Sequence, residues 1–130
     1  MRKILPIILI FSLPGCDQYK FQGMRGAEVS AKVEALNMAD GYRLYLESYK
    51  GTHPHMIDAA GFMRKYGDKG RAYLLDRAFK TNDELEFEAD MMSMFISDFT
   101  CNKNDFQRLI SKSKEIGSDA IFVYRACELR

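Results

Sequence analysis

Apolar side chains recur every three or four residues along most of this chain, and this spacing restricts the possible fold more than any other feature of the sequence. The longest such series covers residues 28–49 and consists of Val29, Val33, Leu36, Ala39, Tyr42, Leu46 and Tyr49. Residues spaced in this way lie on one face of an α-helix, which has about 3.6 residues per turn. We therefore predict a long helix over 28–49, in which Gly41 is the point where the helix can kink or split.

Three further segments carry start and stop signals of helices. Pro54 suits the first turn of a helix over 54–66, and Gly67 suits its C-terminal cap. Apolar residues at helical spacing predict another helix over 68–79 and one that opens around residues 102–104 and runs to 116. Short turns separate these segments, as expected of helices that pack against their neighbours in sequence.

Residues 81–99 predict a helix with a marked N-terminus. Thr81 and Glu84 have the spacing of a capping box, and acidic residues crowd the first turns, where the helix dipole favours negative charge. The expected inner stripe is Leu85, Ala89, Met92, Phe95, Ile96 and Phe99. On this interpretation Met91 and Met94 lean away from the core. Exposed methionines of this kind suit a soft copper(I) site or an adaptable binding groove, although core packing is the simpler explanation for the group.

The last segment, residues 118–130, fits both a strand and a helix. Residues 120–124 are rich in strand formers, whereas Ala120, Val123, Tyr124 and Cys127 also have helical spacing. No other segment shows sustained two-residue alternation, so a strand here would have no partner for its backbone groups. We therefore favour a helix.

Together these segments predict an all-α domain of about five to six helices. It is either a small bundle or a short α-hairpin array, loosely similar to HEAT-type repeats. The distinction matters because an array presents a concave face to a partner, whereas a closed bundle usually does not.

The N-terminus has the form of a cleaved leader. Two basic residues precede an apolar run over 4–13, which is much shorter than the roughly 20 residues that a membrane-spanning helix needs. The residues that follow, Leu13-Pro14-Gly15-Cys16, resemble the lipobox of bacterial lipoprotein precursors. This resemblance implies cleavage before Cys16, acylation of Cys16 with chains such as palmitate, and stable attachment to a membrane. The alternative is an ordinary secretory leader, which also exports the domain.

Asp17 directly follows the proposed lipidation site. In Gram-negative lipoproteins, an aspartate at this position resembles the signal that keeps the protein in the inner membrane, on its periplasmic face. The following residues up to 26 are polar and glycine-containing, as expected of a tether. We therefore divide the chain into a signal peptide over 1–15, a lipidated tether over 16–26 and a helical domain over 27–130.

The charge balance argues against a nucleic-acid partner. Residues 1–15 hold two of the 19 basic residues and none of the 18 acidic ones, so the mature chain has 17 basic residues and a formal charge of −1. A domain that binds a nucleic-acid backbone usually has a clear basic excess. We expect no nucleic-acid binding.

The three cysteines predict one disulfide. If Cys16 carries lipid, Cys101 and Cys127 remain as a pair in an oxidising compartment. Neither belongs to a C-x-x-C motif, so a structural bridge is preferred over two buried thiols or a reactive site. Such a bridge would stabilise a small domain by roughly 3–4 kcal/mol.

Residues that could carry chemistry are few. His53 and His55 flank Pro54, and Asp58 is close enough in sequence to be a third metal ligand. These are weak candidates for a metal site, and a solvent-exposed helix start is the preferred explanation. The chain has no Gly-x-Ser-x-Gly motif or phosphate-binding glycine loop, and carboxylate pairs such as Glu86 with Asp90 or Glu84 with Glu88 occur on any solvated helix. We expect no cofactor.

From these observations we predict a protein-binding module without catalytic activity. It would be held by lipid on the periplasmic face of a bacterial membrane and would engage another cell-envelope protein, in an immunity- or adaptor-type role. The tyrosines at 42, 45, 49, 66 and 73 suit recognition where they are exposed, although most are expected in the core. The alternative is an envelope hydrolase or metal-handling protein that uses His53 and His55.

Overall fold

The computed structural model describes residues 20–127, apart from the side chains of residues 52–58. Over this range the all-α prediction is confirmed, because the described elements are helices and the sole β-type pairing is an isolated bridge between Phe21 and Met24. The elements are α2 (Gly26–Ala35), α3 (Met38–Thr52), the 3-10 helix η2 (His53–Tyr66), α4 (Asp68–Lys80), α5 (Glu84–Ile96), α6 (Lys103–Ile116) and α7 (Ile121–Ala126). Within residues 20–127, no helix is long and apolar enough to cross a membrane.

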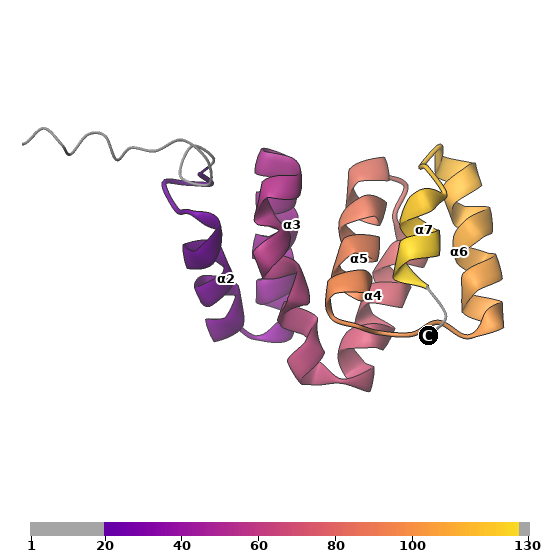
Figure 1. Cartoon of the computed structure of the whole chain (residues 1–130), viewed down its shortest axis with the longest axis horizontal. Helices are drawn as coiled ribbons and strands as arrows, with labels where there is room; N and C mark the ends of the chain where they lie inside the picture. Colours follow the sequence, from indigo (N-terminus) through magenta and orange to yellow (C-terminus); the bar gives the residue numbers. More distant parts are fainter. Residues whose placement is uncertain (1–19, 128–130) are drawn as a thin grey trace, which may run out of the picture.

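The helices stand side by side along the long axis of the molecule (Figure 1). α2 lies at one end, α6 and α7 lie at the other, and α5 lies between them. η2 packs against α2, α3 and α5, while α5 also contacts α3, α4 and α7. This arrangement corresponds to a short array of helical hairpins in which α5 is the most enclosed element.

The single helix predicted over 28–49 is wrong, because the chain forms two helices there. Leu36 is extended and ends α2, and the side chain of Asn37 accepts a hydrogen bond from the backbone N–H of Asp40 at 2.9 Å, which caps the start of α3. Gly41 therefore does not divide the helix. A Cβ atom at Gly41 would lie 3.1 Å from the carbonyl oxygen of Val33, so this glycine permits the close packing of α3 on α2.

The segment after α3 is helical as predicted, but it has 3-10 geometry over His53–Tyr66. Its contact with α5 is close. The carbonyl of Ala60 accepts hydrogen bonds from the hydroxyls of Ser93 at 2.7 Å and Ser97 at 3.4 Å, and a Cβ atom at Gly61 would lie 3.2 Å from Ile96 Cγ2. Carbonyl bonding to a neighbouring helix thus accompanies the tight 3-10 winding of this segment.

The N-terminus of α5 is capped differently from the prediction. Asp83 is the N-cap, and its Oδ1 accepts hydrogen bonds from the backbone N–H groups of Leu85 at 2.8 Å and Glu86 at 3.3 Å. Thr81 accepts from the N–H of Asp83 and donates to the Glu86 carboxylate. The predicted Thr81–Glu84 capping box is therefore wrong, because a second capping residue lies two positions further on.

The predicted inner stripe of α5 is also wrong in part. Met91 and Met94 are buried, whereas Met92, Phe95 and Ile96 are half-buried. α5 is enclosed by neighbours on several sides, so its core face is much wider than a single stripe. The buried residues of α5 are Phe87, Glu88, Ala89, Asp90, Met91, Ser93 and Met94.

The start of the chain's described part is folded rather than extended. The backbones of Phe21 and Met24 exchange two hydrogen bonds of 2.9 Å, which close a turn before α2. The Phe21 ring lies against Gly51 of α3, where a Cβ atom would be 3.1 Å away. Residues 21–24, which the sequence assigns to the tether, therefore pack on the helical body.

Candidate functional site

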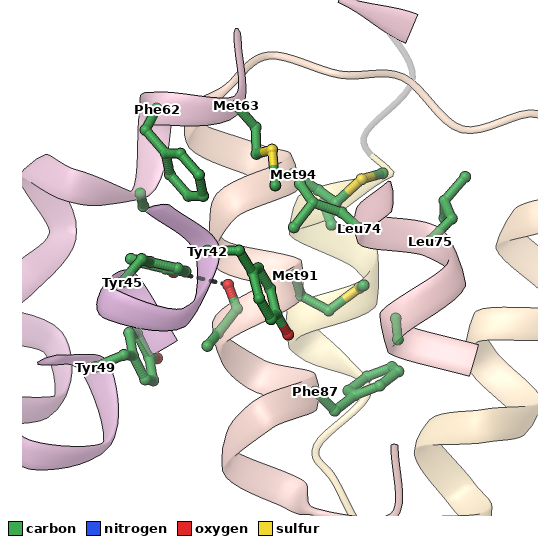
Figure 2. Packing of buried hydrophobic residues seen from close by; sticks show 14 of the residues in the cluster. Tyr42, Tyr45, Tyr49, Phe62, Met63, Leu74, Leu75, Phe87, Met91 and Met94 are labelled. Atoms are coloured by element: carbon green, nitrogen blue, oxygen red, sulfur yellow. Dashed lines mark hydrogen bonds between the residues drawn. The ribbon is translucent and has the colours of Figure 1, made fainter. Parts of the chain in front are cut away.

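Three tyrosines of α3 donate hydrogen bonds to three consecutive residues of α5. The donors are Tyr42, Tyr45 and Tyr49, and their acceptors are Asp90 Oδ1 at 2.7 Å, the Ala89 carbonyl at 2.7 Å and Glu88 Oε1 at 2.6 Å. The three rings are buried, as the sequence indicated for most of the tyrosines, and Figure 2 shows them on one side of α3 among the core residues of α5. This tyrosine ladder fixes the register of α3 against α5.

Asp90 is the one fully buried carboxylate among the described residues. Its Oδ1 accepts from Tyr42, and its Oδ2 has no hydrogen-bond partner. Burial raises the pKa of Asp90 well above its ordinary value, and burial together with the nearby Asp90 raises the pKa of the Tyr42 hydroxyl. Because solvent does not reach Asp90, this pair acts in packing rather than on a substrate.

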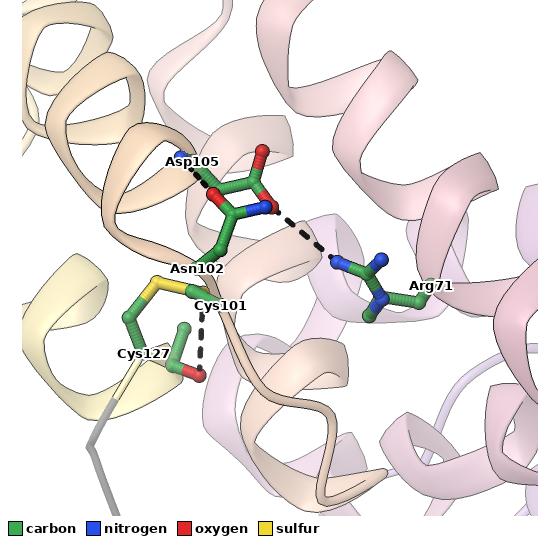
Figure 3. Close-up of a disulfide and its surroundings, with 6 residues drawn as sticks. Arg71, Cys101, Asn102, Asp105 and Cys127 are labelled. Carbon is green, nitrogen blue, oxygen red and sulfur yellow. Dashed lines mark hydrogen bonds and ion pairs between the residues drawn. A yellow bond between two sulfur atoms is a disulfide. The ribbon is translucent and has the colours of Figure 1, made fainter.

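The disulfide between Cys101 and Cys127 is present, which confirms the predicted pairing (Figure 3). Both sulfur-bearing residues are buried, and the bridge ties the end of α7 to the residue before the α6 N-cap, Asn102. Nearby, Arg71 of α4 pairs with the mostly buried Asp105 of α6 at 3.4 Å. The C-terminal helices are thus fixed by one covalent bond and one ion pair between elements.

α7 presents apolar side chains to solvent. Among the large apolar residues of the described chain, Tyr124 at 56 % and Ile121 at 43 % are the most exposed. The Tyr124 ring lies against Phe106 of α6, with centroids 5.5 Å apart. On the opposite side of α7, Val123 and Ala126 are buried. We call Ile121, Phe122, Tyr124 and Arg125 the α7 surface.

A small hollow lies between the α7 surface and α5. Its volume is about 110 Å³. It is lined by Met91, Met92, Phe95 and Ile96 of α5 and by Phe122 and Arg125 of α7. The hollow is thus apolar with a single cationic side chain. The methionine cluster of α5 is a partial signal for this hollow, because Met91 and Met92 line it, whereas Met94 does not.

A larger and more open cleft, of about 610 Å³, lies where α4 meets α5. Its lining residues are Arg77, Lys80, Thr81, Asn82, Asp83 and Glu86. Three of its charged side chains already have partners. Lys50 lies 3.1 Å from both Asp83 and Glu86, and these carboxylates raise the pKa of Lys50. Lys80 lies 3.1 Å from Asp76. The mixed and paired charges do not select a ligand of either sign.

The other sequence-predicted sites are distributed as follows. Cys16 and Asp17 lie outside the described residues. His53 and His55 belong to η2, but their side chains and that of Asp58 lie outside the described set. Among the side chains that are described, no three His, Cys, Asp or Glu residues gather in a way that could hold a metal ion.

The carboxylates of α5, whose spacing is that of a solvated helix face, are separated by the fold, because Glu88 and Asp90 are buried. Glu88 and Asp90 point inward to tyrosines, while Glu86 pairs with Lys50 at the surface. Neither Glu86 with Asp90 nor Glu84 with Glu88 therefore forms an acid–base pair across a cleft.

Comparisons with known proteins give no relative for this chain: no family model, no curated protein and no solved structure matches it.

Proposed function

We propose that this chain is a lipid-anchored periplasmic protein-binding module, without catalytic activity, that engages another protein of the bacterial cell envelope. The role is of the immunity or adaptor type. The anchor is Cys16, and Asp17 favours retention in the inner membrane. The observation that carries the binding role is the α7 surface, where the two most exposed large apolar side chains of the described chain lie together.

The composition of the α7 surface supports protein binding. Aromatic residues and arginine are enriched at the centres of protein interfaces, where they contribute most of the binding free energy. Tyr124 and Arg125 are both exposed, and Ile121 lies beside them on the same side of the helix. The disulfide at Cys127 holds this short helix in place, so little conformational entropy is lost when a partner binds.

The position of the α7 surface also supports this function. Lys20, the first described residue, is four positions after the proposed lipidation site Cys16, a reach of at most about 14 Å. The N-terminal end of the body would therefore stay close to the bilayer. α6 and α7 lie at the opposite end of the long axis (Figure 1), where a periplasmic partner could reach them.

The lipid anchor is tested by metabolic labelling with radioactive palmitate. We expect the wild-type protein to be labelled and to fractionate with the membrane, and Cys16→Ala to lose both properties. Asp17→Ser should move labelled protein from the inner to the outer membrane. Unlabelled wild-type protein recovered from the cell interior would refute the anchor and the proposed compartment.

The binding role is tested by a photo-reactive amino acid placed at position 124 in the full chain in cells. We expect one stoichiometric cross-linked protein, and no such product from position 43, which is exposed on α3 and does not belong to the α7 surface. A second measurement tests the alternative, a catalytic or metal-handling role of His53 and His55. If His53→Ala with His55→Ala abolished function while the thermal midpoint and partner capture stayed unchanged, the binding module would be refuted.

A further inference from the structure

The hollow beside α7 has the size of one side chain. An engineered apolar cavity of about 150 Å³ accepts benzene. A volume of about 110 Å³ therefore suits one branched aliphatic group. The acyl chain of a lipid is several times larger, so the volume favours a protein side chain over a lipid tail.

The charge of the hollow specifies what should lie beside that aliphatic group. Arg125 lines the hollow and is exposed. Among the side chains that the structure describes, none forms an ion pair with Arg125. A partner that covers the hollow would remove water from the guanidinium, which is unfavourable unless a carboxylate takes the place of that water. Carboxylates also match the paired N–H donors of arginine.

From the shape and charge together, we infer that the hollow binds a leucine- or isoleucine-sized side chain of a partner polypeptide while Arg125 pairs with an aspartate or glutamate of the same segment. This inference rests on the proposed binding function and names the chemistry of the partner. Met92, half-buried at the hollow, adapts its unbranched side chain to the inserted group.

The hollow depends on the disulfide. Phe122 and Arg125 come from α7, and the other lining residues come from α5. α7 has only six residues, too few to be stable alone, so it keeps its place through packing on α5 and through the bond from Cys127 to Cys101. Reduction should therefore weaken binding at the hollow.

The test uses the full-length protein in detergent micelles and a phage-displayed library of random peptides. We expect the wild-type protein to select peptides that combine a leucine or isoleucine with a nearby acidic residue. Arg125→Glu should select peptides in which the acidic residue is replaced by a basic one, and should bind the wild-type peptides about tenfold more weakly or worse. Arg43→Glu is the matched control, because it makes the same change of charge at an exposed arginine of α3 that does not line the hollow.

The site is located by the methyl NMR signals of the methionines. Titration with a selected peptide should shift the Met92 signal and leave that of Met38, in α3, unchanged. Circular dichroism melts verify that each variant is folded. Selection that Arg125→Glu leaves unchanged, a Met92 signal that does not move, or no selection at all would overturn the inference. Self-association that Phe122→Ala abolishes would place a second copy of this chain in the hollow and overturn it too.

The two proposals fail separately. A cross-linked partner in cells combined with a negative peptide selection would leave the binding function standing and remove this site. A positive peptide selection without any cross-linked partner in cells would leave this site standing and refute the proposed binding function.

Discussion

Removing the Cys101–Cys127 disulfide should lower the free energy of unfolding by about 3.5 kcal/mol. The two cysteines are 26 residues apart, and the chain-entropy model gives roughly this value for a loop of that length at 25 °C. A domain of about 100 residues loses about 4 °C of thermal midpoint per kcal/mol, so the midpoint should fall by about 15 °C. This change is a large part of the total stability of so small a domain.

The assay is urea unfolding followed by circular dichroism, in the Cys16→Ala background so that Cys101 and Cys127 are the only cysteines. Oxidised protein is compared with the same protein in reductant and with the Cys101→Ala, Cys127→Ala double variant. Reduction keeps both sulfur atoms in the core, whereas the double variant also loses their packing. We expect the double variant to be the less stable of the two.

Hydrogen exchange should show which helix loses amide protection first when the disulfide is removed. Without the bridge, the six-residue helix α7 is held by non-covalent packing of residues such as Val123 and Ala126. Its amides should therefore lose protection before those of α3 and α5. A stability difference below about 1 kcal/mol between oxidised and reduced protein would refute the reasoning, because the chain-entropy model of loop closure would then not apply to this loop. Loss of protection in α3 before α7 would refute the inference that the bridge mainly stabilises α7.

Two further predictions concern the core. Asp90→Asn should stabilise the protein at pH 7, because burial raises the pKa of Asp90. The stability that the protonated Asp90 contributes is fully present below about pH 4 and is lost as the pH rises through the raised pKa. Thermal melts should therefore show a smaller gain from Asn at pH 4 than at pH 7. Asp90→Ala should instead cost about 1–3 kcal/mol, since the buried Tyr42 hydroxyl loses its acceptor, and equal stability of the two variants at pH 7 would contradict this. Gly70→Ala should destabilise the protein by about 1–3 kcal/mol in urea unfolding despite the better helix propensity of alanine, because its Cβ would lie 2.6 Å from the backbone oxygen of Met63; an unchanged midpoint would show that α4 can shift at no cost.

Much of the fold is readable from local sequence. Helix ends with side-chain or glycine caps, such as Asn102 and Gly117 around α6, are set within a few residues, so periodicity and caps predicted the helices and the helical state of the C-terminus. Two kinds of cap defeat such predictions. An internal cap, Asn37, divides the helix predicted over 28–49, and Asp83, two residues after Thr81, replaces the predicted cap of α5. The disulfide was predicted because cysteine pairing follows from number and compartment.

The sequence by itself thus determined the class of the fold and the sulfur pairing, because helix class depends on residues near one another and the pairing on a simple count. Only the tertiary structure decided which face of α5 is buried, that Asp90 lies under Tyr42, and that Met92 and Arg125 share one hollow. These features depend on residues from different helices. Their positions are set by close packing across the whole core, which no local pattern records.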